Sequence, residues 1–486
     1  MDLVIRGGTV VAPSGPFVGD IGIAGGRIAA LGGAGVIDRG AREIDATGMY
    51  VVPGGVDPHV HTALKSGGTR TLDNFLESTR AAAYGGTTTI VDFAIPDNAS
   101  NQTPRAAFEQ KLDAIAGQAT VDVALHACVT GVNDESVHDL RSLLRSGLPT
   151  LKMFSIYRGD FMLEPSEIHE CLKEVEAANG LALIHCESPH IVEPLIREFG
   201  NNGQTDVRFH ALSRPPAAEL DMVQTIIEML RITGAMGYVV HVSTPEAAKA
   251  ILRARRDGVR VWAETCPQYV FLEESVYEAA HGELYVCSPP LRDDSRRAEL
   301  WQLVLGGHID VWGSDHCAYS TDQKTAAAGD FRRIPNGLPG VETRCPLLFS
   351  KGVSRGLLDL ADFVQLTATN PARFAGLYPR KGVILPGSDA DIVVYDPEAR
   401  ATLSGSGLHM TTDYTPFDGI EVEGCPRTVL SRGRVVVDEG KFVGSAGHGQ
   451  FIPGQSPKPP FSRPRTYVHH KQGSKAGSGS TRTIGQ

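Results

Sequence analysis

The chain has 486 residues and a net charge of −10 at pH 7, with an isoelectric point near 5.9. This acidic balance argues against nucleic acid or an anionic membrane as its main partner. No apolar run approaches the roughly 20 residues of a membrane span, and residues 1–8 resemble a short strand and turn rather than a signal peptide. Eight cysteines without C-x-x-C spacing favour a reduced cytoplasmic enzyme.

Both ends of the chain resemble short strands separated by glycine turns. The stretches are 3–5, 9–11, 21–23, 27–31 and 43–45, and later 391–395, 428–430 and 434–437. Hairpin signals occur at Arg6-Gly7-Gly8 and Arg432-Gly433-Arg434. We predict one small β-sandwich domain built from residues 1–54 and 379–450, with two unrelated β-segments as the alternative.

Strand-like and helix-like stretches alternate between these ends. The expected strands are 56–61, 87–93, 121–129, 151–154, 181–186, 238–242, 259–264 and 311–314. Helical patterns separate them, as at 217–232 and at 245–257, where Ser-Thr-Pro-Glu forms a cap. The alternation predicts an α/β fold, a (β/α)8 TIM-like barrel over residues 55–378 rather than an open sheet. No G-x-G-x-x-G follows a strand, which weakens a nucleotide-binding alternative.

The end of the chain is rich in Gly, Ser, Pro and Lys from residue 444. We expect residues 451–486 to form a flexible tail, or an arm that lies on a neighbouring subunit. A homo-oligomer, either a tetramer or a dimer, is the expected assembly.

Five separated patches each end a strand-like run with a residue suited to a divalent-metal site. They are His59-Val60-His61, Lys152, His185, His241 and Asp315. Alternate side chains of a strand share a face, so His59 and His61 can bind one ion together. Barrel enzymes carry their sites at the C-terminal ends of the strands, where all five patches fall. Four imidazoles and one carboxylate suit zinc or a similar ion, either as one metal with five ligands or as two metals with a bridge.

Lys152 is the candidate for that bridge. An ammonium with an unperturbed pKa of about 10.4 cannot ligate a cation. Reaction of the neutral amine with carbon dioxide would give a carbamate, whose two oxygens can span two ions. A salt-bridge lysine and a Schiff-base lysine are the alternatives, but the histidines and aspartate on neighbouring strand ends favour the bridge.

Each motif also has an ordinary structural explanation. A single H-x-H is usually not a metal site, and His185 or His241 alone would be a hydrogen-bonded core histidine. Asp315 alone could cap a helix. The role of His316 stays open. The histidines expected to be structural or exposed are His126, His138, His169, His281 and His308.

Together these residues resemble the cyclic amidohydrolases of the dihydropyrimidinase and D-hydantoinase type, within the amidohydrolase superfamily. The matching segments are 53–61, 85–88, 151–157, 184–187, 241–243, 263–268, 287–292, 314–317, 333–344 and 387–397. The most specific is Arg-Ile-Pro-Asn-Gly-Leu-Pro-Gly-Val-Glu-Thr-Arg. The resemblance implies two divalent ions, expected to be zinc, bridged by Lys152 as N6-carboxylysine. It assigns one ion to His59, His61 and Asp315, and the other to His185 and His241.

The resemblance further implies hydrolysis of a small cyclic amide, a 5,6-dihydropyrimidine or a 5-substituted hydantoin, to an N-carbamoyl amino acid. A hydroxide held between two cations would attack the ring carbonyl. Asp315 would carry the proton to the departing ring nitrogen, and Tyr157 would donate a hydrogen bond to the developing oxyanion. Ser288 and Asn336 match positions that contact the cyclic substrate, largely through backbone groups.

Several alternatives remain at the level of substrate and class. Dihydroorotases usually carry an arginine where this chain has Ala63, which disfavours dihydroorotate. In the loop after His61, Lys65 and Arg70 are either solvated or favour anionic ring substituents. An allantoinase or a cyclic imidase could use the same metal centre. A non-catalytic scaffold like the collapsin-response mediator proteins is the competing class, although those proteins have lost metal ligands that are kept here.

Overall fold

The computed structural model describes residues 1–66 and 68–460; residue 67 and residues 461–486 lie outside that description. Its centre is a sheet of eight parallel strands that neighbour one another in chain order. These strands are β6 (Gly55–Val60), β9 (Thr87–Ala94), β10 (Asp122–Cys128), β11 (Thr150–Phe154), β12 (Leu181–His185), β13 (Met236–Val239), β14 (Val261–Thr265) and β15 (Val311–Trp312). The predicted (β/α)8 barrel is confirmed.

Backbone contacts of His316 bring the last strand against the first. The His61 amide donates to the His316 carbonyl at 2.8 Å, and the His316 amide donates to the His59 carbonyl at 3.2 Å. Val60 and His316 form a parallel bridge at this seam. The ring is therefore nearly closed beside the predicted metal ligands.

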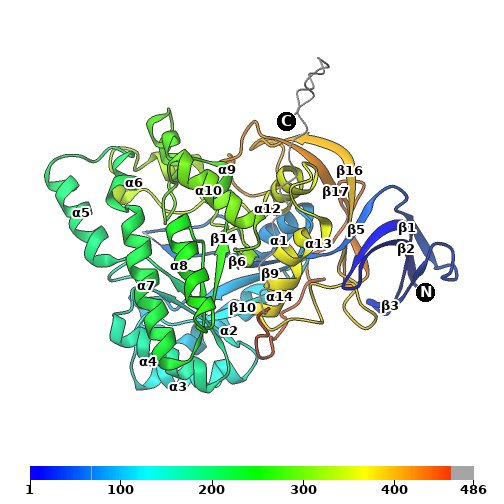
Figure 1. Ribbon diagram of the computed structural model, residues 1–486, viewed down its shortest axis with the longest axis horizontal. Helices are drawn as coiled ribbons and strands as arrows, with labels where there is room; N and C mark the ends of the chain where they lie inside the picture. The colour runs from blue at the N-terminus through cyan, green and yellow to red at the C-terminus, as the bar shows by residue number, and fades with distance from the viewer. Residues whose placement is uncertain (67, 461–486) are drawn as a thin grey trace, which may run out of the picture.

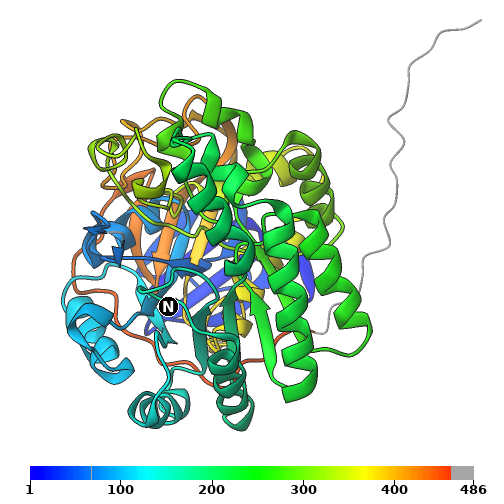
Figure 2. The same cartoon turned by 90° about the vertical axis from the view of Figure 1, so that its left-hand side faces the viewer.

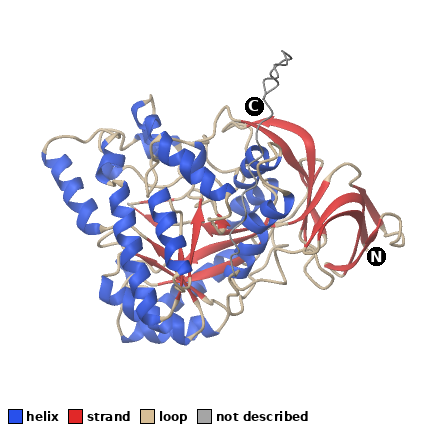
Figure 3. Cartoon of the chain, in the orientation of Figure 1, coloured by secondary structure: helices blue, strands red, loops and turns tan. Residues whose placement is uncertain are grey.

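Helices surround the strands (Figures 1 and 3), and Figure 2 shows the barrel from the side opposite the terminal sheet. The helices are α1 (Phe75–Tyr84), α2 (Pro104–Ile115), α3 (Asp134–Arg145), α4 (Pro165–Ala177), α5 (Pro189–Asn201), α6 (Phe209–Ser213), α7 (Pro216–Thr233), α8 (Pro245–Arg256), α9 (Pro267–Phe271), α10 (Asp294–Leu305), α11 (Thr321–Thr325), α12 (Arg344–Leu348), α13 (Leu360–Val364) and α14 (Asn370–Phe374). The expected cap of α8 is confirmed, since the Thr244 side chain accepts from the Ala247 amide. Within the described ranges no helix has the length and apolar character that crossing a membrane requires.

The two chain ends form one mainly antiparallel sheet, in which β5 lies between β16 of the C-terminal part and β1 of the N-terminal part (Figure 1). Its strands are β1 (Leu3–Ala12), β2 (Gly15–Ala24), β3 (Arg27–Gly33), β4 (Arg42–Asp45), β5 (Tyr50–Pro53), β16 (Ile392–Thr402), β17 (Glu421–Ser431), β18 (Arg434–Asp438) and β19 (Lys441–Phe442). The ends meet where β5 pairs with β16, with Val51 opposite Val394. Apolar side chains from both ends, such as Ile21 and Leu430, share one core. A single sheet assembled from both ends is thus confirmed.

The two expected hairpin turns have different outcomes. At Arg432-Gly433 both residues have positive φ, +45° and +73°, and Ser431 pairs with Arg434, as a tight hairpin requires. At Arg6-Gly7-Gly8 the hairpin prediction is wrong, because β1 continues through these residues. The register shifts between Ile5 and Gly8, and β1 changes its parallel neighbour from β4 to β5 there. Glycine serves a bulge as readily as a turn, so local sequence did not separate the two.

A buried charge cluster joins the terminal sheet to the barrel. The Lys381 ammonium lies 2.5 Å from Asp122 at the start of β10, 2.7 Å from Asp391 and 3.0 Å from Asp389. Arg432 adds a second contact to Asp122 at 3.1 Å. Lys381 is completely buried, so the cluster fixes the barrel and the sheet by desolvated ion pairs.

Part of the expected tail packs on the barrel instead of extending from it. The Val123 amide donates to Gln450, and the buried Ile452 donates back to Val123 at 2.8 Å. The Gly454 amide donates to Gly147 at 2.8 Å. These bonds satisfy backbone groups near the starts of β10 and β11, which is why residues 451–460 are held in place. The remainder of the expected tail, residues 461–486, lies outside the described residues.

Candidate metal centre

One cavity of about 240 Å3 opens at the C-terminal ends of the barrel strands. All nine residues singled out from the sequence line it: His59, His61, Lys152, Tyr157, His185, His241, Ser288, Asp315 and Asn336. They come from segments spread over more than half of the chain, which parallel strand ends bring together.

His59, His61 and Asp315 form a compact group at the seam of the barrel. One ligand-type atom from each lies within 4.8 Å of the others. The Nε2 atoms of His59 and His61 lie 3.1 Å and 3.3 Å from the same oxygen, Asp315 Oδ1. All three residues are buried. Two imidazole nitrogens that converge on a carboxylate are compatible with a divalent metal ion.

His185 and His241 form a second group beside the first. Their ring centroids are 4.4 Å apart, and the His241 ring is 5.4 Å from that of His59. The buried Nδ1 of His241 has no hydrogen-bond partner among the described residues. Leaving such a nitrogen unpaired is costly unless a ligand uses it.

Lys152 lines the same cavity in a form that suits the carbamate hypothesis. Its side chain is completely buried, and its Nζ has no hydrogen-bond partner in the described part of the chain. The nitrogen lies 5.1 Å and 4.8 Å from the ring centroids of Phe93 and Phe154. Burial lowers the pKa of Lys152 to about 8, although Asp315 and Glu264 act in the opposite direction. The amine therefore loses its proton more readily than an ordinary lysine. No carboxylate among the described residues forms the alternative salt bridge with it.

Two buried carboxylates set which ring nitrogen of each histidine faces the cavity. Glu264 Oε1 lies 2.7 Å from His59 Nδ1, and Glu187 Oε2 lies 2.8 Å from His185 Nε2. Each contact leaves the other nitrogen of the ring available, as is common for metal-bound histidines. Burial raises the pKa of Glu264 to about 7.

Arg214 compensates the charge of Glu187. Its Nη1 donates to Glu187 Oε2 at 2.7 Å, and its guanidinium lies 5.7 Å from the Tyr157 ring centroid. Burial alone would raise the pKa of Glu187, but Arg214 and His185 outweigh it and lower the pKa to about 2. No sequence pattern indicated a role for this arginine or for the two glutamates. Glu187 and Glu264 do lie in or beside strand ends, but nothing local marks Arg214.

Backbone strain is concentrated at the same place. Tyr157, His241 and Asp315 have φ values of +75°, +40° and +51°. Non-glycine residues rarely adopt this region, and when they do they are often at functional sites. The surrounding structure holds these three side chains toward the cavity at a conformational cost.

Tyr157, Ser288 and Asn336 line another part of the same cavity. The Tyr157 ring is 5.3 Å from the His185 ring, and Ser288 Oγ donates to Asn336 Oδ1 at 3.0 Å. Desolvation raises the pKa of Tyr157 above its ordinary value. Its hydroxyl therefore keeps its proton and remains a hydrogen-bond donor at neutral pH.

Two other histidines near the centre have structural roles. Both ring nitrogens of His126 are hydrogen-bonded, to Thr150 Oγ1 at 2.6 Å and to the Pro58 carbonyl at 2.9 Å. His316, whose role the sequence left open, contacts Asp73 at 2.6 Å and accepts from the Gly340 amide at 3.0 Å. His316 therefore orders the loops around the seam.

The loop after His61 presents its apolar and small side chains to the cavity. Leu64 and Ser66 line it, whereas Lys65 and Arg70 do not. The Lys65 side chain is 67% exposed and lies 3.2 Å from Asp97. The structure therefore favours the alternative in which Lys65 and Arg70 are solvated. Their effect on anionic ring substituents stays a prediction.

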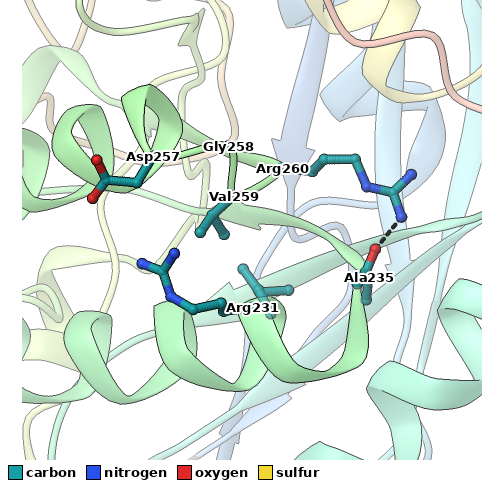
Figure 4. Close-up of a pocket in the computed structure, with 8 residues that line it drawn as sticks. Arg231, Ala235, Asp257, Gly258, Val259 and Arg260 are labelled. Carbon is teal, nitrogen blue, oxygen red and sulfur yellow. Dashed lines mark hydrogen bonds between the residues drawn. The ribbon is translucent and has the colours of Figure 1, made fainter.

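A second cavity of about 120 Å3 lies near the C-terminal ends of α7 and α8, on the side of the barrel away from the metal-type residues. Figure 4 shows Arg231, Asp257, Val259 and Arg260 around it. The Arg260 guanidinium donates to the Gly234 carbonyl. None of the nine predicted site residues lines this cavity, so the chemistry belongs to the first one.

A barrel with imidazoles, a buried amine and a carboxylate at its strand ends is typical of metal-dependent barrel hydrolases. The sequence pattern of the amidohydrolase family matches residues 50–436. The D-hydantoinase of Geobacillus stearothermophilus is 37% identical over 93% of this chain and 96% of its own length. The D-hydantoinase of Streptomyces coelicolor is 40% identical over 93% of this chain and 97% of its own length. The crystal structure of dihydropyrimidinase from Brevibacillus agri matches with a TM-score of 0.92 and 38% identity, over 95% of this chain and all of that one. The chain belongs to the amidohydrolase family, in the group of the D-hydantoinases and dihydropyrimidinases.

Proposed function

We propose that this protein is a metal-dependent cyclic amidohydrolase that opens a 5,6-dihydropyrimidine or a 5-substituted hydantoin to an N-carbamoyl amino acid. The observation that carries the proposal is the convergence of four histidines, Asp315 and the buried Lys152 in one cavity, where the Lys152 Nζ has no hydrogen-bond partner among the described residues. The kinship with D-hydantoinases supports the substrate class.

The donor set fits two divalent ions. His59, His61 and Asp315 would hold one ion, and His185 and His241 the other. Carbamylated Lys152 would bridge them: the neutral amine forms a nitrogen–carbon bond to carbon dioxide and releases one proton. When bound, ions of this kind, with zinc as the expected metal, supply a hydroxide from water near neutral pH and polarise a carbonyl.

Asp315 is the proton carrier in this proposal. Burial alone would raise its pKa, but His59 and His61 outweigh it and hold the pKa below the ordinary value. The ionised carboxylate can accept a proton from the attacking water and give it to the ring nitrogen. The carbon–nitrogen bond of the ring then breaks, with the hydroxyl on carbon and the proton on nitrogen.

Tyr157 donates a hydrogen bond to the carbonyl oxygen as negative charge develops on it. Ser288 and Asn336 hold the edge of the ring. Because the contacts there involve backbone groups, truncating either side chain is expected to change turnover little.

The deciding experiment is a hydrolysis panel of dihydrouracil, substituted hydantoins, allantoin and succinimide, with metal analysis of the purified protein. We expect about two ions per chain, together with hydrolysis of the first two substrate classes. Lys152→Ala should lose the metal pair and nearly all activity. Turnover of only allantoin or only succinimide would assign the alternative enzymes. A metal-free, inert protein would assign the scaffold.

The remaining proposals concern the cell and the assembly. We place the protein in the cytoplasm as a homo-oligomer, a tetramer or a dimer. Light scattering on the purified chain measures the assembly directly.

A further inference from the structure

Lys324 on α11 is a second buried lysine, and it does not line the cavity. Its Nζ donates to two backbone carbonyls, those of Val286 and Pro335, both at 2.7 Å. Unlike Lys381, it contacts no carboxylate in the described part of the chain. Burying a lysine without a counter-charge is unfavourable, so its placement calls for a function other than ion pairing.

The two carbonyls belong to the two segments that contribute Ser288 and Asn336 to the lining of the cavity. Val286 lies two residues before Ser288, and Pro335 directly precedes Asn336. The segments also meet directly, because the Gly337 amide donates to the Val286 carbonyl at 3.0 Å and Ser288 donates to Asn336 at 3.0 Å. Lys324 therefore lies behind this part of the cavity.

Neither segment is held by regular secondary structure, although the Cys287 carbonyl accepts from His210 Nε2 at 2.7 Å. Residues 286–288 and 334–337 belong to no helix or strand. The Val286 carbonyl accepts from Gly337 as well as from Lys324, but the Pro335 carbonyl has no other donor among the described residues. The segments are joined to each other by the Lys324 side chain and by two direct hydrogen bonds, from Gly337 to Val286 and from Ser288 to Asn336.

We propose that Lys324 is a positioning residue that ties residues 286–288 to residues 335–337 and so sets the distance between the two groups that hold the cyclic substrate. The proposal rests on the proposed function, and Lys324 acts through these segments without touching the substrate.

The tie does not require a permanent charge. Burial lowers the pKa of Lys324 to about 7, with Cys287 and Cys317 acting in the opposite direction. An ammonium has three N–H groups and a neutral amine has two, so either form can serve both carbonyls.

Lys324→Met tests the proposal, because methionine keeps much of the volume but cannot donate. Ground-state and transition-state binding should both weaken, so KM should rise with kcat nearly unchanged. We expect kcat/KM to fall about 10- to 100-fold, the range that follows from displacing a binding group by about 1 Å. Lys324→Gln, which keeps two donors on a shorter side chain, should recover part of the loss.

A second readout is independent of activity. Hydrogen exchange should accelerate in peptides that cover 286–288 and 335–337, in metal-free as well as metal-loaded protein. Leu300→Ala is the control for general destabilisation, since Leu300 is a buried residue on α10 away from the cavity. It should lower stability and leave KM and the exchange of these two segments unchanged.

Each result is decisive. Unchanged exchange in the two segments overturns the tie, and faster exchange with an unchanged KM overturns its role in binding. If Leu300→Ala lowers kcat/KM as much as Lys324→Met does, Lys324 contributes only to packing. If wild-type protein hydrolyses no cyclic amide, the proposed function fails and the binding role falls with it, while hydrogen exchange still decides the tie.

Discussion

Replacing Glu187 by glutamine removes one negative charge from beneath the candidate metal centre without changing the side-chain shape. A single oxygen, Oε2, serves both His185 at 2.8 Å and Arg214 at 2.7 Å. The amide can still accept with its oxygen, but it no longer compensates the buried guanidinium. It also holds the His185 ring less firmly in the orientation that leaves Nδ1 toward the cavity.

The pKa of Glu187 gives the magnitude. Burial opposes ionisation, yet Arg214 and His185 bring the pKa from 4.5 to about 2, which corresponds to about 3 kcal/mol at about 1.4 kcal/mol per pH unit. A depressed carboxyl pKa stabilises the folded state above the unfolded value, and that stability is lost as the pH falls from about 4.5 through about 2. At pH 7 the free energy of unfolding of the variant should therefore be about 3 kcal/mol lower than that of wild type. Its metal affinity should fall about 10- to 100-fold, as for other partners of metal-bound histidines.

Two measurements at pH 7 check this: denaturant unfolding of the metal-free protein, and metal affinity by competition with a chelator. Glu219→Gln is the matched control. Glu219 is also a buried carboxyl, it accepts from Ser243 at 2.8 Å and 2.6 Å, and it contacts none of the proposed ligands. Burial raises its pKa, so its amide variant should retain wild-type metal affinity. If Glu187→Gln binds metal as tightly as the control, the orienting role of Glu187 is refuted.

Three further predictions address the reaction, the domain junction and pH. Tyr157→Phe should lower kcat by about 10²- to 10³-fold through loss of an oxyanion donor, while metal content stays at the wild-type level; a kcat within threefold of wild type would exclude that role. Lys381→Met leaves three buried carboxylates without their shared cation, so denaturant unfolding should show a loss of about 3–5 kcal/mol; a loss below about 1 kcal/mol would contradict it. From pH 7 to 9, the free energy of unfolding of wild type should rise relative to that of Lys324→Met by up to about 1.4 kcal/mol per pH unit. The reason is that burial lowers the pKa of Lys324 in the folded state to about 7, so the unfolded chain binds more protons than the folded chain in this pH range. A pH-independent difference in unfolding free energy would show that Lys324 keeps an ordinary pKa.

The sequence was sufficient to predict the barrel and the convergence of its polar strand ends. Both follow from local patterns, because apolar runs mark the strands and parallel strands place their ends on one face. His59 and Asp315 could therefore be brought together although 255 residues separate them. The sequence left two roles open for Lys65 and Arg70, because two-residue strands such as Lys65–Ser66 and Thr69–Arg70 are too short to show a period.

Partners that meet only through tertiary packing were also missed. Arg214 and Lys324 follow no strand and match no spacing, and their contacts lie at Glu187, Val286 and Pro335. Arginine and lysine are usually exposed, so composition gives no reason to expect either of them in the interior. Both side chains are nevertheless buried in the fold.

The seam at His316 has a consequence for how the enzyme is made. The last barrel strand joins the first through the residue next to Asp315, so the ring and the His59–His61–Asp315 group are completed together. During synthesis, the chain must emerge from the ribosome to well beyond residue 316 before this group can form. Nascent chains that stop earlier hold two histidines on an open sheet edge, which pairs readily with other strands. Fragments that end before β15 should therefore aggregate rather than bind metal as a partial site.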